Sequence, residues 1–414
     1  MAQSERSAQS ERELLGERLG RYPAERYPVQ HAATQFHLGS ALLLAGDFIP
    51  AAGALRAARD MFEQAGMRLE KAKANVMLGA ALRADGRRDQ AVAAFSAACA
   101  DLAQLDQPAE QAAASYNLGL VLQDSGERGG ARAAWASAYT LFLTAGYPGQ
   151  ASAAAREHGV SLLTTGDVTA AVGLLQNAVA LAERAGDEPA MGSAANTLGL
   201  AHLAAQAPAP ALVALRAALG AFPRSTRPAD HAMVKANLAL AHEQAGAPAR
   251  ARLAARQALA VPGAAAPVRA QATQLLARLS GSPDQDLFTV LDAEPREQWV
   301  PVLREELLRA AELTAGQRCT AVGGFLDGVL ARPGASRDLA ESLLQVVLEL
   351  PPRTYQLFVS ALVDACAGRP DADAERLRTV ISSALARFAV PQWQRLAASL
   401  NAAAQVAGAP ATWT

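Results

Sequence analysis

Hydrophobic and polar positions along the chain follow a helical spacing, and the whole pattern returns every 40 residues. Each copy has an apolar segment around a small residue, a polar turn, and a second apolar segment in which two alanines lie seven residues apart. The copies occupy residues 37–58, 77–98, 117–138, 157–178, 197–218 and 237–258. A fixed period of roughly 20 to 50 residues is typical of solenoids, so the pattern predicts helical pairs stacked in series.

Three columns of the pattern predict how the two helices of a copy pack. A small residue in the first helix would let the second helix approach closely; this column reads Gly39, Gly79, Gly119, Gly159, Gly199 and Ala239. Seven residues later a second glycine, replaced by Gln206 in the fifth copy, suits a left-handed helix end. Between the two alanines lies a bulky column: Leu55, Phe95, Trp135, Leu175 and Leu215, with Ala255 in the sixth copy. Small and large side chains are therefore expected to interlock.

Acidic residues follow several of these turns. Asp47, Glu127 and Asp167 suit the start of the second helix, where exposed N–H groups and the helix dipole favour negative charge. The fifth copy has APAPA in place of the glycine turn, which predicts that its second helix begins late, at Pro208 or Pro210.

These columns resemble the tetratricopeptide repeat (TPR) family. Its pattern of L-G-x2-Y followed by A-x3-F-x2-A is matched by LGLVL at 118–122 and ARAAWASA at 131–138, and the resemblance covers residues 31–262. The period is 40 residues rather than the 34 of the common repeat, which implies longer helices. The family's tyrosine is replaced by leucine in four copies and by His202 and His242 in the last two. The resemblance implies an all-α fold, a right-handed α-solenoid of six TPR helical hairpins followed by a smaller helical C-terminal domain.

The flanking segments complete the expected domain organisation. Residues 1–30 form a polar N-terminal extension with a candidate capping helix over 10–20, ended by the two prolines of RYPAERYP. Residues 263–286 form a capping helix, at 267–279, and a linker. Residues 287–414 form the helical C-terminal domain, with Ser336 and Asp371 as N-caps. Its helices are expected near 296–314, 317–331, 337–350, 353–367, 372–389 and 391–407.

Composition and charge narrow the class of protein. The net charge is −1, so no global field would attract nucleic acid or an anionic membrane. Three widely separated cysteines without CxxC spacing predict neither a disulfide framework nor a structural zinc site. The N-terminal segment has no apolar region typical of a signal peptide, and no uncharged apolar run is long enough for a transmembrane helix. A cytoplasmic location is therefore expected.

A search for chemistry-bearing motifs predicts no catalytic residues, no cofactor-binding residues and no metal ligands. The sequence has no phosphate loop, no dinucleotide fingerprint after a strand, no G-x-S-x-G and no H-E-x-x-H. His202 and His242 occupy one column of adjacent repeats and are interpreted as packing residues. The glycines between Gly323 and Gly328 indicate close packing of two soluble helices. Trp299 and Trp393 are either core residues or anchors for a partner.

The candidate binding surface follows from the TPR resemblance. In TPR arrays the first helices line the concave surface, where partner peptides commonly bind. The corresponding residues form the predicted partner groove: Phe36, Lys73, Val76, Arg83, Tyr116, Gln123, Asp124, Arg156, Asn196 and Glu243. Each is either a contact or part of a solvated helix face. The carboxylate clamp of chaperone-binding TPR domains does not appear, so chaperone C-termini are not the expected partners.

Three functions stay open. The leading hypothesis is a non-enzymatic protein-interaction scaffold or adaptor that binds a protein or peptide partner in this groove. The alternative is a peptide- or effector-responsive regulator with the C-terminal helical domain as its output. An enzyme with a site in the C-terminal domain is the third. No nucleic acid or membrane partner is expected, and homo-oligomerisation is left open.

Overall fold

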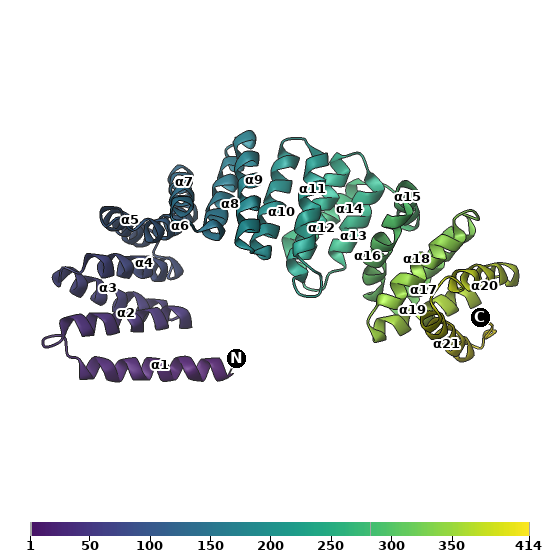
Figure 1. The fold of residues 1–414 in the computed structure, drawn as a ribbon, viewed down its shortest axis with the longest axis horizontal. Helices are drawn as coiled ribbons and strands as arrows, with labels where there is room; N and C mark the ends of the chain where they lie inside the picture. Colours follow the sequence, from purple (N-terminus) through teal and green to yellow (C-terminus); the bar gives the residue numbers. More distant parts are fainter. Residues whose placement is uncertain (1, 282, 414) are drawn as a thin grey trace. The chain divides into compact units, whose positions relative to one another are not determined.

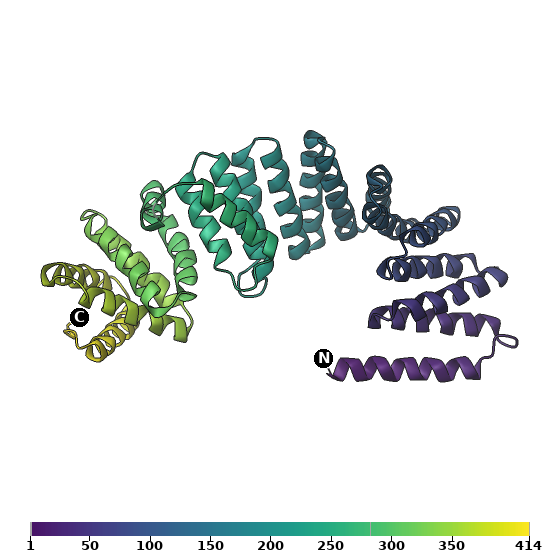
Figure 2. The same cartoon turned by 180° about the vertical axis from the view of Figure 1, so that it is seen from behind.

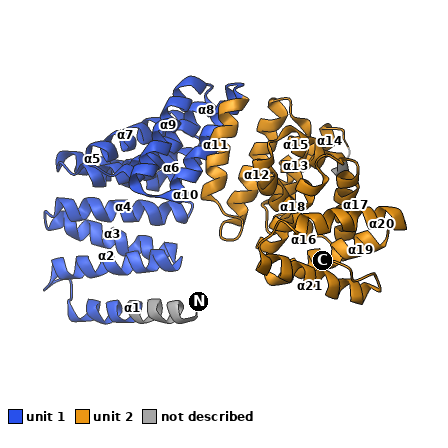
Figure 3. Cartoon of the chain, turned by 45° about the vertical axis from the view of Figure 1, so that its right-hand side comes forward, with its two compact units in different colours: residues 1–207 blue, residues 208–414 orange. Residues whose placement is uncertain are grey.

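The computed structural model of the chain describes residues 2–281 and 283–413, with side chains over 12–281 and 285–413. Every regular element within these residues is a helix, which confirms the predicted all-α fold (Figure 1). The chain forms two compact units, residues 1–207 (unit 1) and residues 208–414 (unit 2) (Figure 3). This division falls inside the fifth repeat. The domain boundaries predicted from the sequence, at residues 30, 262 and 286, stay a prediction.

Unit 1 is a series of antiparallel helical hairpins preceded by one helix (Figure 2). Its helices are α1 (Ala2–Arg21), α2 (Pro28–Ala45), α3 (Phe48–Gln64), α4 (Arg68–Ala84), α5 (Arg88–Gln104), α6 (Pro108–Asp124), α7 (Arg128–Thr144), α8 (Pro148–Thr164), α9 (Val168–Ala185) and α10 (Glu188–Ala204). The first helices α2, α4, α6, α8 and α10 begin at residues 28, 68, 108, 148 and 188, so each start repeats the period of the sequence pattern. Helix α1 packs against α2, and its Leu15 is buried.

Glycine columns permit the close approach within each hairpin. A Cβ added to Gly39 would lie 2.5 Å from Leu55 Cγ, and one added to Gly159 would lie 2.7 Å from Leu175 Cγ. In the third copy a Cβ on Gly119 would lie 2.6 Å from Cδ1 of the Trp135 indole. The bulky partners are at most 1% exposed, so they have no free space to move into. The interlocking of small and large side chains predicted from the sequence is confirmed in these hairpins.

The glycine turns end the first helices as predicted, but the starts of the second helices differ in part from the predicted ones. Gly46 has φ 85°, and Gln206 takes the same left-handed conformation in the fifth repeat with φ 56°. Helix α11 begins at Pro208, the first of the two predicted starts, and this start is in phase with the other second helices, so the helix does not begin late. Among the predicted acidic caps only Asp167 accepts a backbone hydrogen bond, from Ala170 N at 3.3 Å. The Asp47 carboxylate instead binds Arg12 Nη1 at 2.7 Å.

A second set of turns joins one hairpin to the next, and sequence analysis missed it. Gly66, Gly146 and Gly186 adopt positive φ there, and Asp106 does so with φ 52°. Asparagine and aspartate tolerate this conformation better than most residues because their short side chains can form local hydrogen bonds.

Unit 2 continues the helical series and adds the C-terminal helices. It contains α11 (Pro208–Ala221), α12 (Pro228–Gln244), α13 (Pro248–Leu259), α14 (Ala266–Arg278), α15 (Pro283–Ala293), the 3₁₀ turn η1 (Arg296–Gln298), α16 (Trp299–Ala311), α17 (Ala315–Leu330), α18 (Ser336–Glu349), α19 (Pro352–Ala367), α20 (Asp371–Leu385) and α21 (Val390–Ala407). Helix α14 is the predicted capping helix and packs on α13 and α12. Helix α15 was not predicted, because its start was interpreted as linker.

Helix α15 is attached to α13 by a buried ion pair. The Asp286 carboxylate is 2% exposed and accepts hydrogen bonds from Arg252 Nη2 at 2.5 Å and Arg256 Nη1 at 2.9 Å. A carboxylate this deeply buried requires such partners, because desolvation of an unpaired charge is costly. The pair fixes the first of the C-terminal helices on the end of the repeat array.

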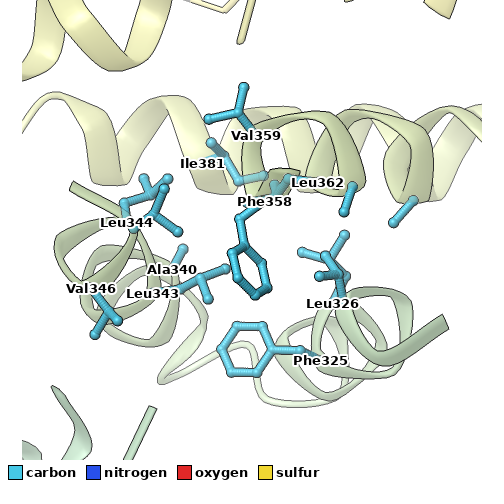
Figure 4. Packing of buried hydrophobic residues seen from close by; sticks show 14 of the residues in the cluster. Phe325, Leu326, Ala340, Leu343, Leu344, Val346, Phe358, Val359, Leu362 and Ile381 are labelled. Atoms are coloured by element: carbon cyan, nitrogen blue, oxygen red, sulfur yellow. The ribbon is translucent and has the colours of Figure 1, made fainter. Parts of the chain in front are cut away.

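The C-terminal helices share one hydrophobic core (Figure 4). Phe358 points towards Phe325 between Leu343 and Leu326, and all four side chains are at most 6% exposed. A Cβ on Gly328 would overlap the ring of Phe288, so this glycine permits the close packing of α17 on α15, whereas a Cβ on Gly323 would meet only Arg369 Nη2, at 3.9 Å.

Trp299 is buried and donates its indole N–H to Leu291 O at 2.9 Å, so it is a core residue. Trp393 packs against the same cluster and is partly buried. Both predicted N-caps are wrong by one residue, since Ala335 and Pro370 precede α18 and α20. Pro370 already has the extended backbone that an N-cap requires.

Candidate functional site

Four residues of the predicted partner groove lie together on α4, α6 and α8 of unit 1. Arg83 Nε donates to Asp124 Oδ2 at 2.8 Å, and this ion pair links the first helices of two successive hairpins. Arg156 Nη2 donates to Glu157 Oε1 at 2.6 Å on α8. Tyr116 lies within electrostatic reach of both pairs. We call Arg83, Tyr116, Asp124, Arg156 and Glu157 the Tyr116 surface; Glu157 was not among the predicted residues.

Tyr116 is the half-buried centre of this surface. Its ring packs against two apolar clusters, one that contains Phe142 and one that contains Trp135. Burial and the nearby Glu157 carboxylate raise the pKa of the Tyr116 phenol, and the Arg156 and Arg83 guanidinium groups oppose this shift. The phenol therefore stays neutral at physiological pH. A neutral aromatic ring between two ion pairs offers apolar contact area at its face and hydrogen bonding at its edge.

The other predicted groove residues differ in what they offer. Lys73 and Gln123 are exposed on α4 and α6. Phe36 and Val76 are partly buried in one apolar cluster between α2, α4 and their neighbours, so much of their surface is already used in packing. Asn196 is only 5% exposed and offers little accessible surface.

Glu243 lies in unit 2, where its carboxylate binds Nε and Nη2 of Arg278 on α14, both at 2.6 Å. This hydrogen bonding lowers the pKa of the Glu243 carboxyl. The sequence pattern could not show this, because α14 lies outside the repeat. A partner that used Glu243 would have to compete with the capping helix.

Unit 2 also contains a cleft that sequence analysis did not predict. Its volume is about 740 Å³, and its charged lining residues are Arg216, Arg224, His231, Glu305 and Glu312. At its base the Glu305 carboxylate lies 3.1 Å from Lys235 Nζ and 3.6 Å from His231 Nε2. Burial alone would raise the pKa of the Glu305 carboxyl, but hydrogen bonding from His231 and the charge of Lys235 lower it to about 2.

Hydrogen bonds hold these buried side chains in place. His231 Nδ1 lies 2.9 Å from Phe222 O, so both ring nitrogens face oxygen atoms. Lys235 Nζ also donates to Gln257 Oε1 at 3.0 Å. Lys235 and Gln257 are each 6% exposed. The network is therefore ordered in advance of any ligand.

One sequence signal could have pointed to His231. The turn before it reads FPRSTRPADH at 222–231, and YPAERYPVQH at 22–31 has the same aromatic, proline and histidine spacing. In both turns the histidine Nδ1 contacts the carbonyl of the aromatic residue, at 2.8 Å for His31 and Tyr22. The repeated spacing would have marked these two histidines as structurally placed. Their further partners, Gln35 and Glu305, differ and had to be seen in the structure.

The two histidines that replace the leucine of the repeat, His202 and His242, are partly buried. Desolvation, with the charges of Arg250, Arg216 and Lys235, lowers the pKa of His242 to about 4, so this ring is a neutral packing residue. Burial also lowers the pKa of His202. Within the described side chains, no group of three histidine, cysteine or acidic residues could hold a metal ion. Over the same part of the chain, no helix is long and apolar enough to cross a membrane.

No protein-family model matches the sequence, and no curated protein matches it either. Solved helical structures resemble it weakly. BtubC (BKLC) from P. vanneervenii is 18% identical over 53% of this chain and 88% of its own, with a TM-score of 0.44. Apo RapI is 12% identical over 82% of this chain and 87% of its own, with a TM-score of 0.48. The APC/C hetero-tetramer Cut9–Hcn1 gives 21% identity over 65% of this chain and a TM-score of 0.45. The match spans 46% of the Cut9–Hcn1 chain that it covers.

Proposed function

We propose that this protein is a non-enzymatic scaffold of the TPR family that binds a segment of another protein on the first helices of unit 1. The Tyr116 surface is the observation that supports this proposal. Tyrosine and arginine are, with tryptophan, the residues most enriched at the energetic centres of protein interfaces. Here a half-buried tyrosine lies beside Arg83 and Arg156, which are both held in place by carboxylates. Such an arrangement has little conformational entropy to lose on binding.

The chemistry of the surface suggests what the partner presents. Positive and negative groups alternate around Tyr116, with Arg83 paired to Asp124 and Arg156 paired to Glu157. A partner segment with an apolar side chain for the Tyr116 ring and polar groups of both signs around it would match. The three free cysteines suit a reducing compartment, so we place the protein in the cytoplasm as part of the same proposal.

The test compares partner recovery by wild type and two tyrosine variants. Tyr116→Ala removes the centre of the surface, and Tyr147→Ala removes an exposed tyrosine at the turn before α8. Affinity purification with quantitative mass spectrometry should recover the same partner with wild type and Tyr147→Ala, and lose it with Tyr116→Ala. Circular dichroism establishes that both variants are folded. Equal recovery by all three proteins would contradict the proposal.

The alternative function, an effector-responsive regulator, is favoured by the unit 2 cleft. The Glu305 carboxyl has a lowered pKa and lies beside the buried His231 and Lys235, and carboxyl groups perturbed in this way are often found at ligand sites. A ligand that binds only the native state raises its stability. Thermal-shift screening with short peptides and small anions, repeated on Glu305→Gln, tests this alternative. A shift seen in wild type and absent from Glu305→Gln would support it, and no shift with any compound would count against it.

A further inference from the structure

The unit 2 cleft has a counterpart in unit 1 at the equivalent place in the repeat. Helices α11, α12 and α13 begin at residues 208, 228 and 248, and they stand four repeats after α3, α4 and α5, which begin at 48, 68 and 88. A cavity of about 380 Å³ is lined by α3 and α5 on its sides and by α4 below. We call it the α3–α5 groove. Its polar lining residues are Arg56, Arg59, Glu63, Lys71, Asn75 and Gln90.

Several lining residues of the two clefts occupy equivalent positions in the repeat. The same four-repeat step leads from Arg56 to Arg216 and from Lys71 to His231, and both of the latter line the unit 2 cleft. It also leads from Asn75 to Lys235. At each cleft an arginine, Arg56 or Arg216, lies on one second helix. The first helix that follows it carries two polar residues four positions apart: Lys71 and Asn75 on α4, and His231 and Lys235 on α12.

In unit 2 the chain itself supplies an occupant for this kind of groove. Helix α16 directs Glu305 to Lys235 Nζ at 3.1 Å and to His231 Nε2 at 3.6 Å. The next residue, Glu306, accepts a hydrogen bond from Gln257 Nε2 at 3.5 Å. Gln257 corresponds to Ala97, which lines the α3–α5 groove. At this place in unit 2, an amphipathic helix with two adjacent glutamates among leucines thus binds polar residues of α12 and α13.

In the α3–α5 groove the corresponding polar groups have no such partner. Asn75 is 2% exposed, and its amide makes no hydrogen bond to any described residue. Arg56 forms no ion pair with the described side chains. The neighbouring cations are already compensated, Lys71 by Glu63 at 3.0 Å and Asp101 at 3.4 Å. The Asn75 amide and the Arg56 guanidinium therefore line the groove as hydrogen-bond donors for a ligand that presents an acceptor.

The combination of an arginine and an asparagine at these two positions does not recur in the next two repeats of unit 1. One repeat later the positions of Arg56 and Asn75 are held by Ser96 and Ser115, and two repeats later by Ala136 and Ala155. These positions carry no positive charge. The α3–α5 groove also lies on the face of α4 opposite Lys73, Val76 and Arg83, so it is separate from the predicted partner groove.

We propose that the α3–α5 groove binds an acidic amphipathic helix of a partner protein, with a glutamate of that helix directed to the Asn75 amide and the Arg56 guanidinium. The partner helix would occupy the place that α16 takes in unit 2. Its carboxylate would accept hydrogen bonds from both groups, and its leucines would cover the apolar floor formed by Leu78 and Leu82.

A synthetic peptide of residues 296–313, which contains the α16 sequence, is the probe. Its affinity for the full-length chain is measured by fluorescence anisotropy, beside a peptide in which both glutamates of α16 are glutamine. Arg56→Glu should weaken binding by about tenfold or more, because an attraction becomes a repulsion. Ser96→Glu, the same new charge at the equivalent position of α5, should leave the affinity unchanged. The glutamine peptide should bind wild type as weakly as the glutamate peptide binds Arg56→Glu.

Two results would overturn the proposal. Equal binding by wild type and Arg56→Glu would show that the peptide binds elsewhere, for instance at the unit 2 cleft, where it would displace α16. Self-association of the full-length chain that Arg56→Glu abolishes, measured by analytical ultracentrifugation, would make a second copy the occupant instead. Asn75→Ala is a further variant, and its expected effect is a weaker affinity with an unchanged circular dichroism spectrum. Because the Tyr116 surface lies on the other face, Tyr116→Ala should not alter peptide binding.

Discussion

Replacing Gly119 by alanine should destabilise the protein, whereas the same substitution at Gly53 should stabilise it. Alanine is favoured over glycine within a helix by about 1 kcal/mol, and this gain applies at both positions. A Cβ at Gly53 would meet no atom within 4 Å, so there the gain is realised in full. A Cβ at Gly119 would lie 2.6 Å from Cδ1 and 2.7 Å from Cε2 of Trp135, which is 1% exposed and enclosed on all sides. Overpacking of this kind costs about 1–3 kcal/mol, and the enclosed indole places the cost near the upper end.

The net expectation is a loss of about 1–2 kcal/mol for Gly119→Ala and a gain of about 0.5–1 kcal/mol for Gly53→Ala. Urea denaturation followed by circular dichroism measures both shifts. Hydrogen exchange of peptides from α6 and α7 localises the loss to the hairpin that contains Gly119. Removing the indole should reverse the sign, so Gly119→Ala in a Trp135→Ala background should be stabilising. The sixth repeat already combines the two changes, with Ala239 and Ala255 both fully buried. An equal or higher stability of Gly119→Ala in the wild-type background would refute the steric explanation.

Three further substitutions test other contacts, each by the shift of the urea midpoint. The Trp135 indole N–H is buried without an acceptor among the described residues, so Trp135→Phe should cost less than about 1 kcal/mol, against about 3–5 kcal/mol for Trp135→Ala. His242 has a folded-state pKa of about 4 against 6.5 for the free side chain, so the unfolded chain binds more protons between these values and stability falls as the pH drops from 6.5 to 4. His242→Leu, which installs the leucine of the first four repeats, should remove up to about 3 kcal/mol of this pH dependence, whereas substitution of the exposed His37 by glutamine should leave it unchanged. Asp286→Asn should destabilise unit 2 by about 3–5 kcal/mol, because Arg252 and Arg256 lose their shared carboxylate; a loss below about 1 kcal/mol would show that α15 is held by its apolar contacts alone.

The sequence predicted those parts of the fold whose contacts recur. Gly119 and Trp135 could be paired in advance because five other copies show which columns vary together, and the helix ends followed from the left-handed turn residues. Asp106 was missed as a turn residue because the position is glycine in other copies, and an aspartate with positive φ takes its place here.

The contacts that occur once could not be predicted. Glu305 reaches Lys235 from a helix that lies outside the repeat and far along the chain, and no local spacing connects the two. Glu243 was expected to face a partner for the same reason: nothing in the repeat indicates that Arg278 will bind it. For the candidate surface, the pattern placed Arg83, Tyr116, Asp124 and Arg156 on neighbouring helices, but the neighbouring Glu157 became apparent only from the side-chain geometry.

The regular spacing of helix starts also determines which changes in chain length the array can accept. Removing residues 108–147 would take out α6 and α7 together and place Pro148 directly after Gln107, where Pro108 now stands. Ala154 would then occupy the position of Ala114 against α5, and the remaining glycines would still face their bulky partners. A deletion shorter than one full repeat would instead break the spacing inside the hairpin where it falls and turn that hairpin's contact faces away from its neighbours. Length can thus change in steps of one hairpin, and this particular step would remove Tyr116 while keeping the rest of the array intact.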